Sequence, residues 1–216
     1  MQSECILRKR EKALDKLQQN AQNLGVFLEK TQCEKLRVLA ALIRKWNAHI
    51  NLVSRQDIDR LEDRHILDSL AAVPFLPSGA CLDIGSGAGL PGLVFAIANP
   101  QHAHTLCERM SRRCRFLKTA VQEMALDNVE VLEGDVAAIT DRRFAAITAR
   151  AVASPDVIWS WAEPRLESDG AALVFASTKE DVADISYDIP CRVTYHRYHL
   201  PGIGQTHTLM QMEHQQ

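Results

Sequence analysis

The part of the chain with the clearest capacity for chemistry is the glycine-rich segment at residues 80–92. Its first five residues are apolar around a single acid, Asp83, and this pattern predicts a short buried strand. Glycines then follow at alternate positions, where they let the backbone turn sharply and approach a ligand closely. Pro91 suits the first turn of a following helix, because its missing N–H has no partner to lose there. A strand, a glycine turn and a helix N-terminus in this order predict a nucleotide-type cofactor site at the edge of a parallel sheet.

Two kinds of cofactor compete for this turn. Residues 87–92 satisfy the G-x-G-x-x-G pattern of dinucleotide-binding sites, and Glu108 follows where a ribose-binding acid is expected. Asp83, however, would face a pyrophosphate unfavourably, whereas it could answer the cationic methionine end of S-adenosylmethionine. Residues 134–135 follow the third predicted strand, where a loop that contacts adenine is expected. The residues therefore favour S-adenosylmethionine, with a nicotinamide or flavin dinucleotide as the alternative.

A second group of polar residues lies upstream, within a helix predicted over residues 57–73. Arg64, His65, Asp68 and Ser69 share one edge of this helix, because positions three and four apart are neighbours. Such groups also occur on ordinary helix surfaces and at helix ends, so this one does not define a site by itself.

The remaining elements would position these two groups. Apolar residues at spacings of three and four predict two helices within residues 1–50, with Gly25 near the end of the first and a capping box of Thr31 and Glu34 starting the second. Strands and helices then alternate, which predicts a doubly wound parallel sheet. The last two strands have a short connection and are expected to pair antiparallel at one edge. The expected strands are 80–84, 104–108, 129–133, 145–150, 171–176, 191–199 and 207–212, and the expected helices are 91–98, 111–125, 154–166 and 179–185.

The composition excludes several classes of protein. The 216 residues carry a formal net charge of -2, which argues against a globally basic nucleic-acid binder. Residues 1–50 nevertheless hold ten basic and five acidic side chains, which suits either a polyanion-docking face or a solvated helix face. The six cysteines lack C-x-x-C spacing, which excludes a zinc knuckle and favours reduced thiols in a cytosol. The N-terminal residues lack the apolar region of a signal peptide, and the apolar runs are too short to cross a membrane.

A longer set of motifs lies at residues 46–47, 51–52, 64–69, 83–92, 113–117 and 149–151. Read in order, these motifs resemble the RsmG (GidB) family of bacterial 16S rRNA guanine-N7 methyltransferases. The resemblance implies a Class I S-adenosylmethionine-dependent methyltransferase, an α/β Rossmann-like fold with a seven-stranded sheet and an N-terminal helical extension. Residues 1–78 would form the extension and residues 79–216 the methyltransferase domain, packed as one unit. The implied substrate is the guanine at position 527, in the 530 loop of 16S rRNA.

By position, the resemblance implies that Gly85 and Leu90 line the cofactor and that Val136 and Ala137 hold its adenosine through backbone contacts. Arg150 matches the arginine of a family motif at the end of the fourth strand, where ligands of such sheets bind. An ion pair that caps the strand is the alternative role for Arg150. No metal site is expected. The complete expected cofactor set is Asp83, Gly85, Gly87, Leu90, Glu108, Val136, Ala137 and Arg150.

The implied reaction makes modest demands on the residues. N7 of guanine carries a free lone pair at neutral pH, so catalysis should come from positioning and electrostatics rather than from an essential acid or base. Asp68 is a candidate for holding the N1–H and amino edge of the guanine, or for stabilising the cationic product. Arg64 and His65 are candidates for phosphate contact or for shaping the pocket, although His65 suits a structural role equally well. Arg150 completes the set of substrate-positioning candidates.

Further basic residues would meet the RNA. Expected partners are 16S rRNA or the small ribosomal subunit, without a membrane, and the chain is expected to be a cytoplasmic monomer. The three tryptophans, Trp46, Trp159 and Trp161, lie in apolar helical patterns and are expected in the core rather than against bases. A basic cluster without an intervening acid is expected to flank the pocket together with the N-terminal helices. It comprises Arg109, Arg112, Arg113, Arg115 and Lys118.

The sequence also departs from the family pattern. Ala149 replaces a usual serine, Asp135 stands where relatives often carry a basic residue, and Thr206 stands where an arginine is common. Lys179 is followed by Glu180 rather than by glycine. These departures leave open a ribosome-assembly RNA-binding module with little activity. A small-molecule methyltransferase is a further alternative, in which the basic extension would be idle.

Overall fold

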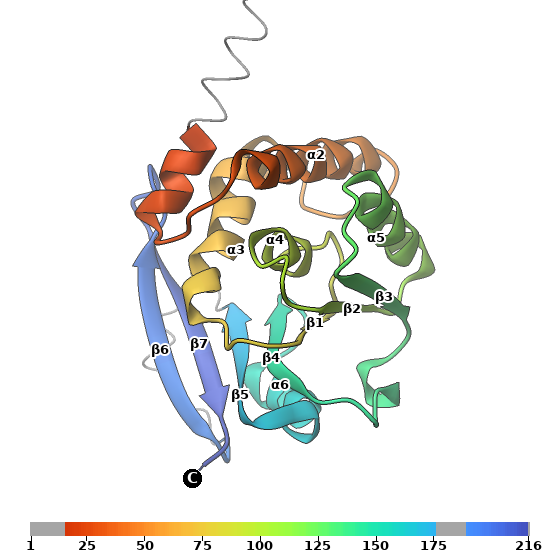
Figure 1. The fold of residues 1–216 in the computed structure, drawn as a ribbon, viewed down its shortest axis with the longest axis vertical. Helices are drawn as coiled ribbons and strands as arrows, with labels where there is room; N and C mark the ends of the chain where they lie inside the picture. Colours follow the sequence, from red (N-terminus) through yellow and green to blue (C-terminus); the bar gives the residue numbers. More distant parts are fainter. Residues whose placement is uncertain (1–15, 176–188, 216) are drawn as a thin grey trace, which may run out of the picture.

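The fold is built on one seven-stranded sheet in the order β3-β2-β1-β4-β5-β7-β6, seen in a computed structural model that describes residues 16–175 and 189–215 (Figure 1). β1 to β5 run parallel, β7 is antiparallel to β5, and β6 is antiparallel to β7. The doubly wound sheet and its antiparallel edge pair are therefore confirmed. The strands are β1 (Cys81–Ile84), β2 (His104–Glu108), β3 (Val129–Glu133), β4 (Phe144–Arg150), β5 (Leu166–Phe175), β6 (Arg192–His199) and β7 (Thr206–Glu213).

The strand order reverses between β1 and β4, the two central parallel strands. Open α/β sheets bind ligands outside the carboxyl ends of their strands at such a reversal, because the connecting loops diverge there. The register pairs Asp83 with Thr148 and Ile84 with Ala149. The glycine turn that follows β1 therefore lies beside Arg150, the last residue of β4.

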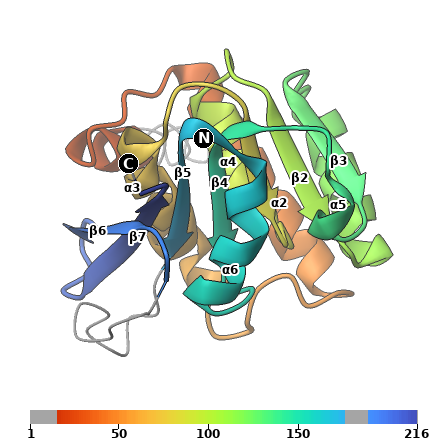
Figure 2. The same cartoon turned by 90° about the horizontal axis from the view of Figure 1, so that it is seen from below.

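Most helices pack on one face of this sheet. The crossover helices α4 (Gly92–Ala98) and α5 (Ser111–Glu123) lie on it, and α2 (Lys30–Asn47) and α3 (Leu67–Ala72) cover them (Figure 1). Leu36, Leu39 and Ile43 of α2 are fully buried in one cluster with Phe116 of α5. The opposite face carries α6 (Pro155–Ala162), whose buried residues belong to a separate cluster (Figure 2). The helices of the N-terminal region thus share a core with the crossover helices.

Two details of the N-terminal helices differ from expectation. The capping box of α2 is formed by Glu29 and Gln32 rather than by Thr31 and Glu34. Gln32 also donates from its amide to the carbonyls of Ile97 and Ala98, at 2.8 and 3.1 Å, so a tertiary contact selects the earlier start. The helix expected over residues 57–73 is instead a succession of turns, with a 3-10 turn (Ile58–Arg60), a π-helical segment η2 (Leu61–Ile66), α3 and a second 3-10 turn (Val73–Phe75). The earlier helix ends as expected, since residues 16–23 are helical and Gly25 has a φ of 80°.

Smaller differences concern element ends in the second half. Pro91 is the N-cap of α4 rather than a residue of its first turn. α6 ends at Ala162, and a 3-10 turn (Glu163–Arg165) that contains Pro164 follows it, because proline cannot continue an α-helix. β5 then begins at Leu166, with a register shift against β4 between Phe144 and Ala146. The helix expected at 179–185 lies outside the described residues.

The five cysteines within residues 16–175 and 189–215 are free thiols. Cys33, Cys81, Cys107, Cys114 and Cys191 are all buried and carry no disulfide. None of the helices in these ranges combines the length and the apolar character that a membrane span requires.

Candidate functional site

The glycine turn after β1 is held against β2 by its own backbone. The N–H groups of Gly85 and Ser86 donate to the carbonyl of Cys107, at 2.8 and 3.2 Å. Gly85, Gly87 and Gly89 have φ values of 67°, 52° and 74°, the left-handed region in which side chains are strained. A Cβ on Gly85 would also stand only 2.8 Å from Val152. At Gly85 and Gly89, a side chain would therefore meet both backbone strain and a steric clash.

The side chain of Asp83 stabilises this turn through hydrogen bonds. Its carboxylate accepts from the Thr148 hydroxyl at 2.9 Å and from the Gly92 N–H at 3.3 Å, which ties β1 to β4 and to the start of α4. The side chain is buried, and burial raises the pKa of Asp83 to about 6 against the opposing effect of its hydrogen bonds. Both hydrogen bonds of Asp83 are made with groups of the protein. Asp83 therefore fixes the loop and places negative charge beneath it.

Glu108 organises the other side of the turn, at the end of β2. Its Oε2 accepts from the Gly87 N–H at 3.0 Å, and its Oε1 accepts from the Met110 N–H at 2.8 Å. Arg113 lies 3.9 Å from Oε2. Each carboxylate oxygen has two lone-pair sites, so Glu108 keeps the capacity to accept hydrogen bonds from ligand hydroxyls.

A cavity of about 230 Å³ opens between these residues and α6. Of the expected cofactor set, Gly85, Glu108 and Val136 line it. Met110, Arg113 and Trp161 line it as well, although none of them belongs to the expected cofactor set. Trp161 is a half-buried wall of this cavity rather than a core residue, whereas Trp159 is buried as expected.

The remaining members of the expected cofactor set surround this cavity without lining it. Leu90 is buried within the cluster beneath the helical layer, and Gly87 binds Glu108. Ala137 lies in a 3-10 turn (Val136–Ala138), where its carbonyl accepts from Arg165 at 3.1 Å. The cavity offers an aromatic wall for a base and an acceptor for ribose hydroxyls, so the residues present fit the adenosine part of S-adenosylmethionine.

A second polar cluster joins the helical layer to the C-terminal end of β4. Arg150 lies 3.6 Å from the Asp68 carboxylate, and it also contacts the ring nitrogen Nδ1 of His65. On its other side, Asp68 accepts from the Tyr198 hydroxyl at 2.6 Å and lies 3.1 Å from Nδ1 of His207. The structure thus brings three of the four substrate-positioning candidates together. Tyr198 and His207, from β6 and β7, are partners that the sequence analysis did not identify.

The pKa shifts in this cluster determine which of its side chains are charged. Burial, together with the neighbouring charge of Arg150, lowers the pKa of His65 to about 4, so the imidazole is neutral at physiological pH. Burial alone would raise the pKa of Asp68, but the His207 contact and the Arg150 charge reverse this effect and lower it. The cluster therefore presents an ionised carboxylate, a guanidinium and a neutral imidazole.

Arg64 does not join this cluster. Its guanidinium pairs with Asp57 at 2.6 Å on the outer side of η2. Asp57 also lies 3.7 Å from Nε2 of His65, so Arg64 connects to the cluster through this shared acid. Of the four residues expected to share one helix edge, His65 and Asp68 join this cluster, whereas Arg64 pairs with Asp57. The hydroxyl of the fourth, Ser69, donates to the His65 carbonyl at 2.8 Å.

The expected basic cluster and the departures from the family pattern spread over several surfaces. Arg109 lies 3.6 Å from Asp135, and Lys118 lies 3.9 Å from Glu133. Asp135 also caps the 3-10 turn by accepting from the Ala137 N–H at 2.9 Å. Ala149 is fully buried in the cluster on the α6 face, and Thr206 is an exposed residue at the start of β7. Arg113 lines the cofactor cavity, whereas Arg112 and Arg115 line a separate groove.

Known proteins resemble this chain in both sequence and fold. The family described as rRNA small subunit methyltransferase G (GidB) matches residues 32–187. A protein named ribosomal RNA small subunit methyltransferase G from Halorhodospira halophila is 36% identical over 78% of this chain and 82% of its own length. One of the same name from Acidiphilium cryptum is 40% identical over 74% of this chain and 75% of its own. The solved structure of a methyltransferase from Geobacter sulfurreducens shares the fold, with a TM-score of 0.55 and 16% identity over 83% of this chain and 89% of that one.

Proposed function

This chain belongs to the rRNA small subunit methyltransferase G family, and on that premise we propose that it methylates N7 of a guanine in the 530 loop of 16S rRNA. The methyl donor is S-adenosylmethionine. The observation that carries the proposal is the polar cluster of His65, Asp68 and Arg150 at the carboxyl end of β4, directly beside the glycine turn.

The cofactor would be held by the turn and by the cavity next to it. When bound, S-adenosylmethionine supplies an electrophilic methyl group on a positively charged sulfur. Glu108 would accept from the ribose hydroxyls, while Val136 and Trp161 would enclose the adenine. Asp83 acts from behind the turn, where its bonds to Gly92 and Thr148 fix the backbone that the cofactor contacts.

The guanine would be oriented by the polar cluster. An ionised Asp68 can accept from N1–H and from the amino group, a pattern that guanine offers and adenine does not. N7 needs no base to become a nucleophile, so the task of these residues is to hold the ring in line with the methyl group. The fixed negative charge of Asp68 also favours the positive charge that develops on the ring. Arg150 and Tyr198 hold Asp68 in place from two sides.

The departure at Ala149 does not favour an inactive module. Its side chain lies in the apolar cluster on the opposite face of the sheet from the polar cluster, so a serine there would not face Asp68. Asp135 caps a turn and lines the cofactor cavity, and its contacts are with the Ala137 N–H and Arg109 rather than with the polar cluster.

The test is methyl transfer from radiolabelled S-adenosylmethionine to small-subunit particles and to naked 16S rRNA that lack the modification. The label should appear in the 530 loop as N7-methylguanine, which is recognised by strand cleavage after reduction and aniline treatment. An Asp68→Asn variant should bind the cofactor normally in calorimetry while its transfer rate falls by roughly 100-fold, a loss typical of one transition-state contact to charge. Label at another ring position, or in another part of the RNA, would contradict the proposal.

A further inference from the structure

Helix α5 separates two hollows of the molecule. Near its N-terminus, Arg113 faces the cofactor cavity and donates to the carbonyl of Asn51 at 3.2 Å. Arg112, Arg115 and Thr119 follow the helical spacing of three and four on a different side, and they line a groove between α5 and α2. Helix α5 therefore forms a wall of both hollows, so a ligand in the groove lies next to the cofactor site.

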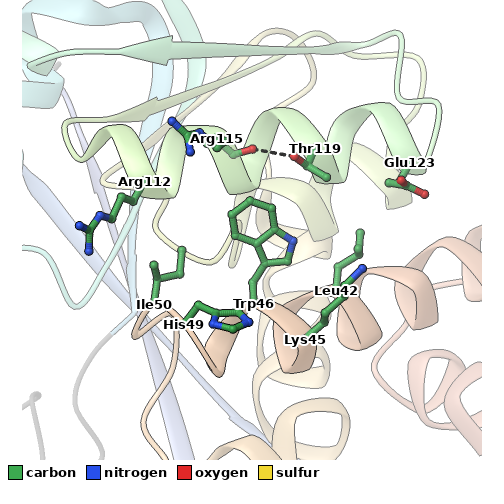
Figure 3. A pocket seen from close by; sticks show the side chains of 9 residues that line it. All are labelled: Leu42, Lys45, Trp46, His49, Ile50, Arg112, Arg115, Thr119 and Glu123. Carbon is green, nitrogen blue, oxygen red and sulfur yellow. Dashed lines mark hydrogen bonds between the residues drawn. The ribbon is translucent and has the colours of Figure 1, made fainter.

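The groove has a volume of about 510 Å³, within the range of ligand-binding sites. Figure 3 shows the indole of Trp46 standing between the two helices, with Arg112 and Arg115 toward one end and Glu123 toward the other. Trp46 packs edge-on against Phe116 at a ring-centroid distance of 5.7 Å and stays half-buried. This ring lines an open groove, contrary to the expectation that it is only a core residue. The complete lining is Leu42, Lys45, Trp46, His49, Ile50, Arg112, Arg115, Thr119 and Glu123.

The charge of the groove is predominantly positive. Lys45, Arg112 and Arg115 have no ion pair or side-chain hydrogen bond to any group in residues 16–175 and 189–215. The groove lining also includes an acid, Glu123. By contrast, Arg109 and Lys118 of the same region are paired with acids, so the free cations gather on the groove side.

We propose that this groove binds a single-stranded segment of the substrate RNA next to the target nucleotide. Free guanidinium groups along one helix suit successive phosphates, and an aromatic ring between them suits a stacked base. An apolar protein helix would leave three cations buried without partners, which disfavours that occupant. This inference rests on the proposed function, because it takes the RNA substrate as the occupant.

The first test is an Arg112→Ala/Arg115→Ala double variant. Loss of two phosphate contacts to single-stranded RNA should reduce the slope of log affinity against log salt by about 1.4. The same loss corresponds to roughly 15-fold weaker binding at 0.15 M salt. The measurement is filter binding of a 16S rRNA fragment that contains the target loop, from 0.05 to 0.3 M salt. The matched control is Arg143→Ala, an exposed arginine just before β4 at the opposite end of the sheet, which should leave slope and affinity unchanged.

The second test is Trp46→Phe, which keeps an aromatic core contact but reduces the stacking surface. Wild-type tryptophan fluorescence should be quenched on RNA binding, and this quenching should be largely absent from the variant. Affinity should fall several-fold, without the change in salt slope that the arginine variants show.

Cofactor calorimetry, RNA binding and the methylation assay together distinguish a failure of this inference from a failure of the proposed function. All three variants should bind S-adenosylmethionine as the wild type does. If the wild type methylates the RNA while the double variant shows unchanged slope and affinity, the groove does not hold RNA and the inference fails alone. If the wild type binds RNA with the expected groove dependence but methylates another site, the proposed target fails while the groove stands.

Discussion

The substitution Thr148→Val removes one hydrogen-bond donor from the buried carboxylate of Asp83 while it keeps the shape of the side chain. The hydroxyl donates at 2.9 Å, and both residues are almost fully buried, so no solvent would replace the lost bond. A hydrogen bond to a charged group contributes about 1.5–3 kcal/mol, whereas one to a neutral group contributes about 0.5–1.5 kcal/mol. The cost of the substitution therefore depends on whether Asp83 is ionised.

The sign of this pH dependence follows from the pKa of Asp83, which burial raises to about 6 from an ordinary value of 3.8. A raised folded-state pKa means that the stability contributed by this carboxyl is fully present below pH 3.8 and is lost as pH rises through about 6. Thr148 stabilises the ionised form, so its removal raises the pKa of Asp83 further. The difference in free energy of unfolding between wild type and variant should therefore grow from about 1 kcal/mol at pH 4.5 to about 2 kcal/mol at pH 8.

The assay is urea denaturation of both proteins at pH 4.5 and pH 8. The control is Thr105→Val on β2, a buried threonine whose hydroxyl accepts from Arg142 at 2.9 Å and has no carboxylate partner within residues 16–175 and 189–215. Its destabilisation should be the same at both pH values. A Thr148→Val variant that loses equal stability at both pH values, or more at pH 4.5, would refute the argument that Asp83 is the group being stabilised.

Three further predictions concern the turn and the polar cluster. Gly89→Ala should destabilise the fold by about 2–4 kcal/mol and abolish cofactor binding, because the added Cβ would lie 2.3 Å from Leu93 at a φ of 74°. Urea denaturation measures the stability and calorimetry measures the cofactor binding. The control is Gly204→Ala, where the added Cβ would meet open space. His65 should stay neutral from pH 8 down to pH 5.5, since its pKa is lowered to about 4, and a ring titration by NMR with a midpoint above 6 would contradict this. Tyr198→Phe should lower the methylation rate by about tenfold and leave cofactor affinity unchanged, because the hydroxyl positions Asp68; equal losses in both would indicate a purely structural role.

The central part of the fold could be predicted because its signals are local. The glycine turn, the alternation of strands and helices, and the short last connection each lie within a few residues of the structure that they dictate. The start of α2 could not be predicted in the same way. Thr31 and Glu34 satisfy the capping-box pattern, whereas Glu29 is neither serine nor threonine. The earlier start depends on carbonyls of α4 that are 65 and 66 residues away from Gln32.

The residues of the site also differ in how far the sequence could predict them. Asp83 could be placed beside the glycine turn from the strand pattern, and Arg150 could be placed at this edge from its match to a family motif at the end of the fourth strand. Tyr198 and His207 could not, because they lie 130 and 139 positions from Asp68 and no short pattern marks them. The basic run at residues 109–118 predicted an RNA surface, but a helix distributes neighbours in sequence over different sides. Only the folded geometry separates Arg113, at the cofactor cavity, from Arg112 and Arg115 in the groove.

The polar cluster also connects the helical layer to the C-terminal strands. Asp68 comes from α3, Arg150 from the end of β4, and Tyr198 and His207 from the edge pair of the sheet. Because Asp68 is buried and ionised, the loss of any one partner leaves charge poorly compensated, which costs more than an exposed pair would. The arrangement of the helical layer against the sheet is therefore coupled to the position of the group that would read the guanine. A substitution in the edge strands that moves Tyr198 should thus affect methyl transfer before it affects cofactor binding, although those strands do not line the cofactor cavity.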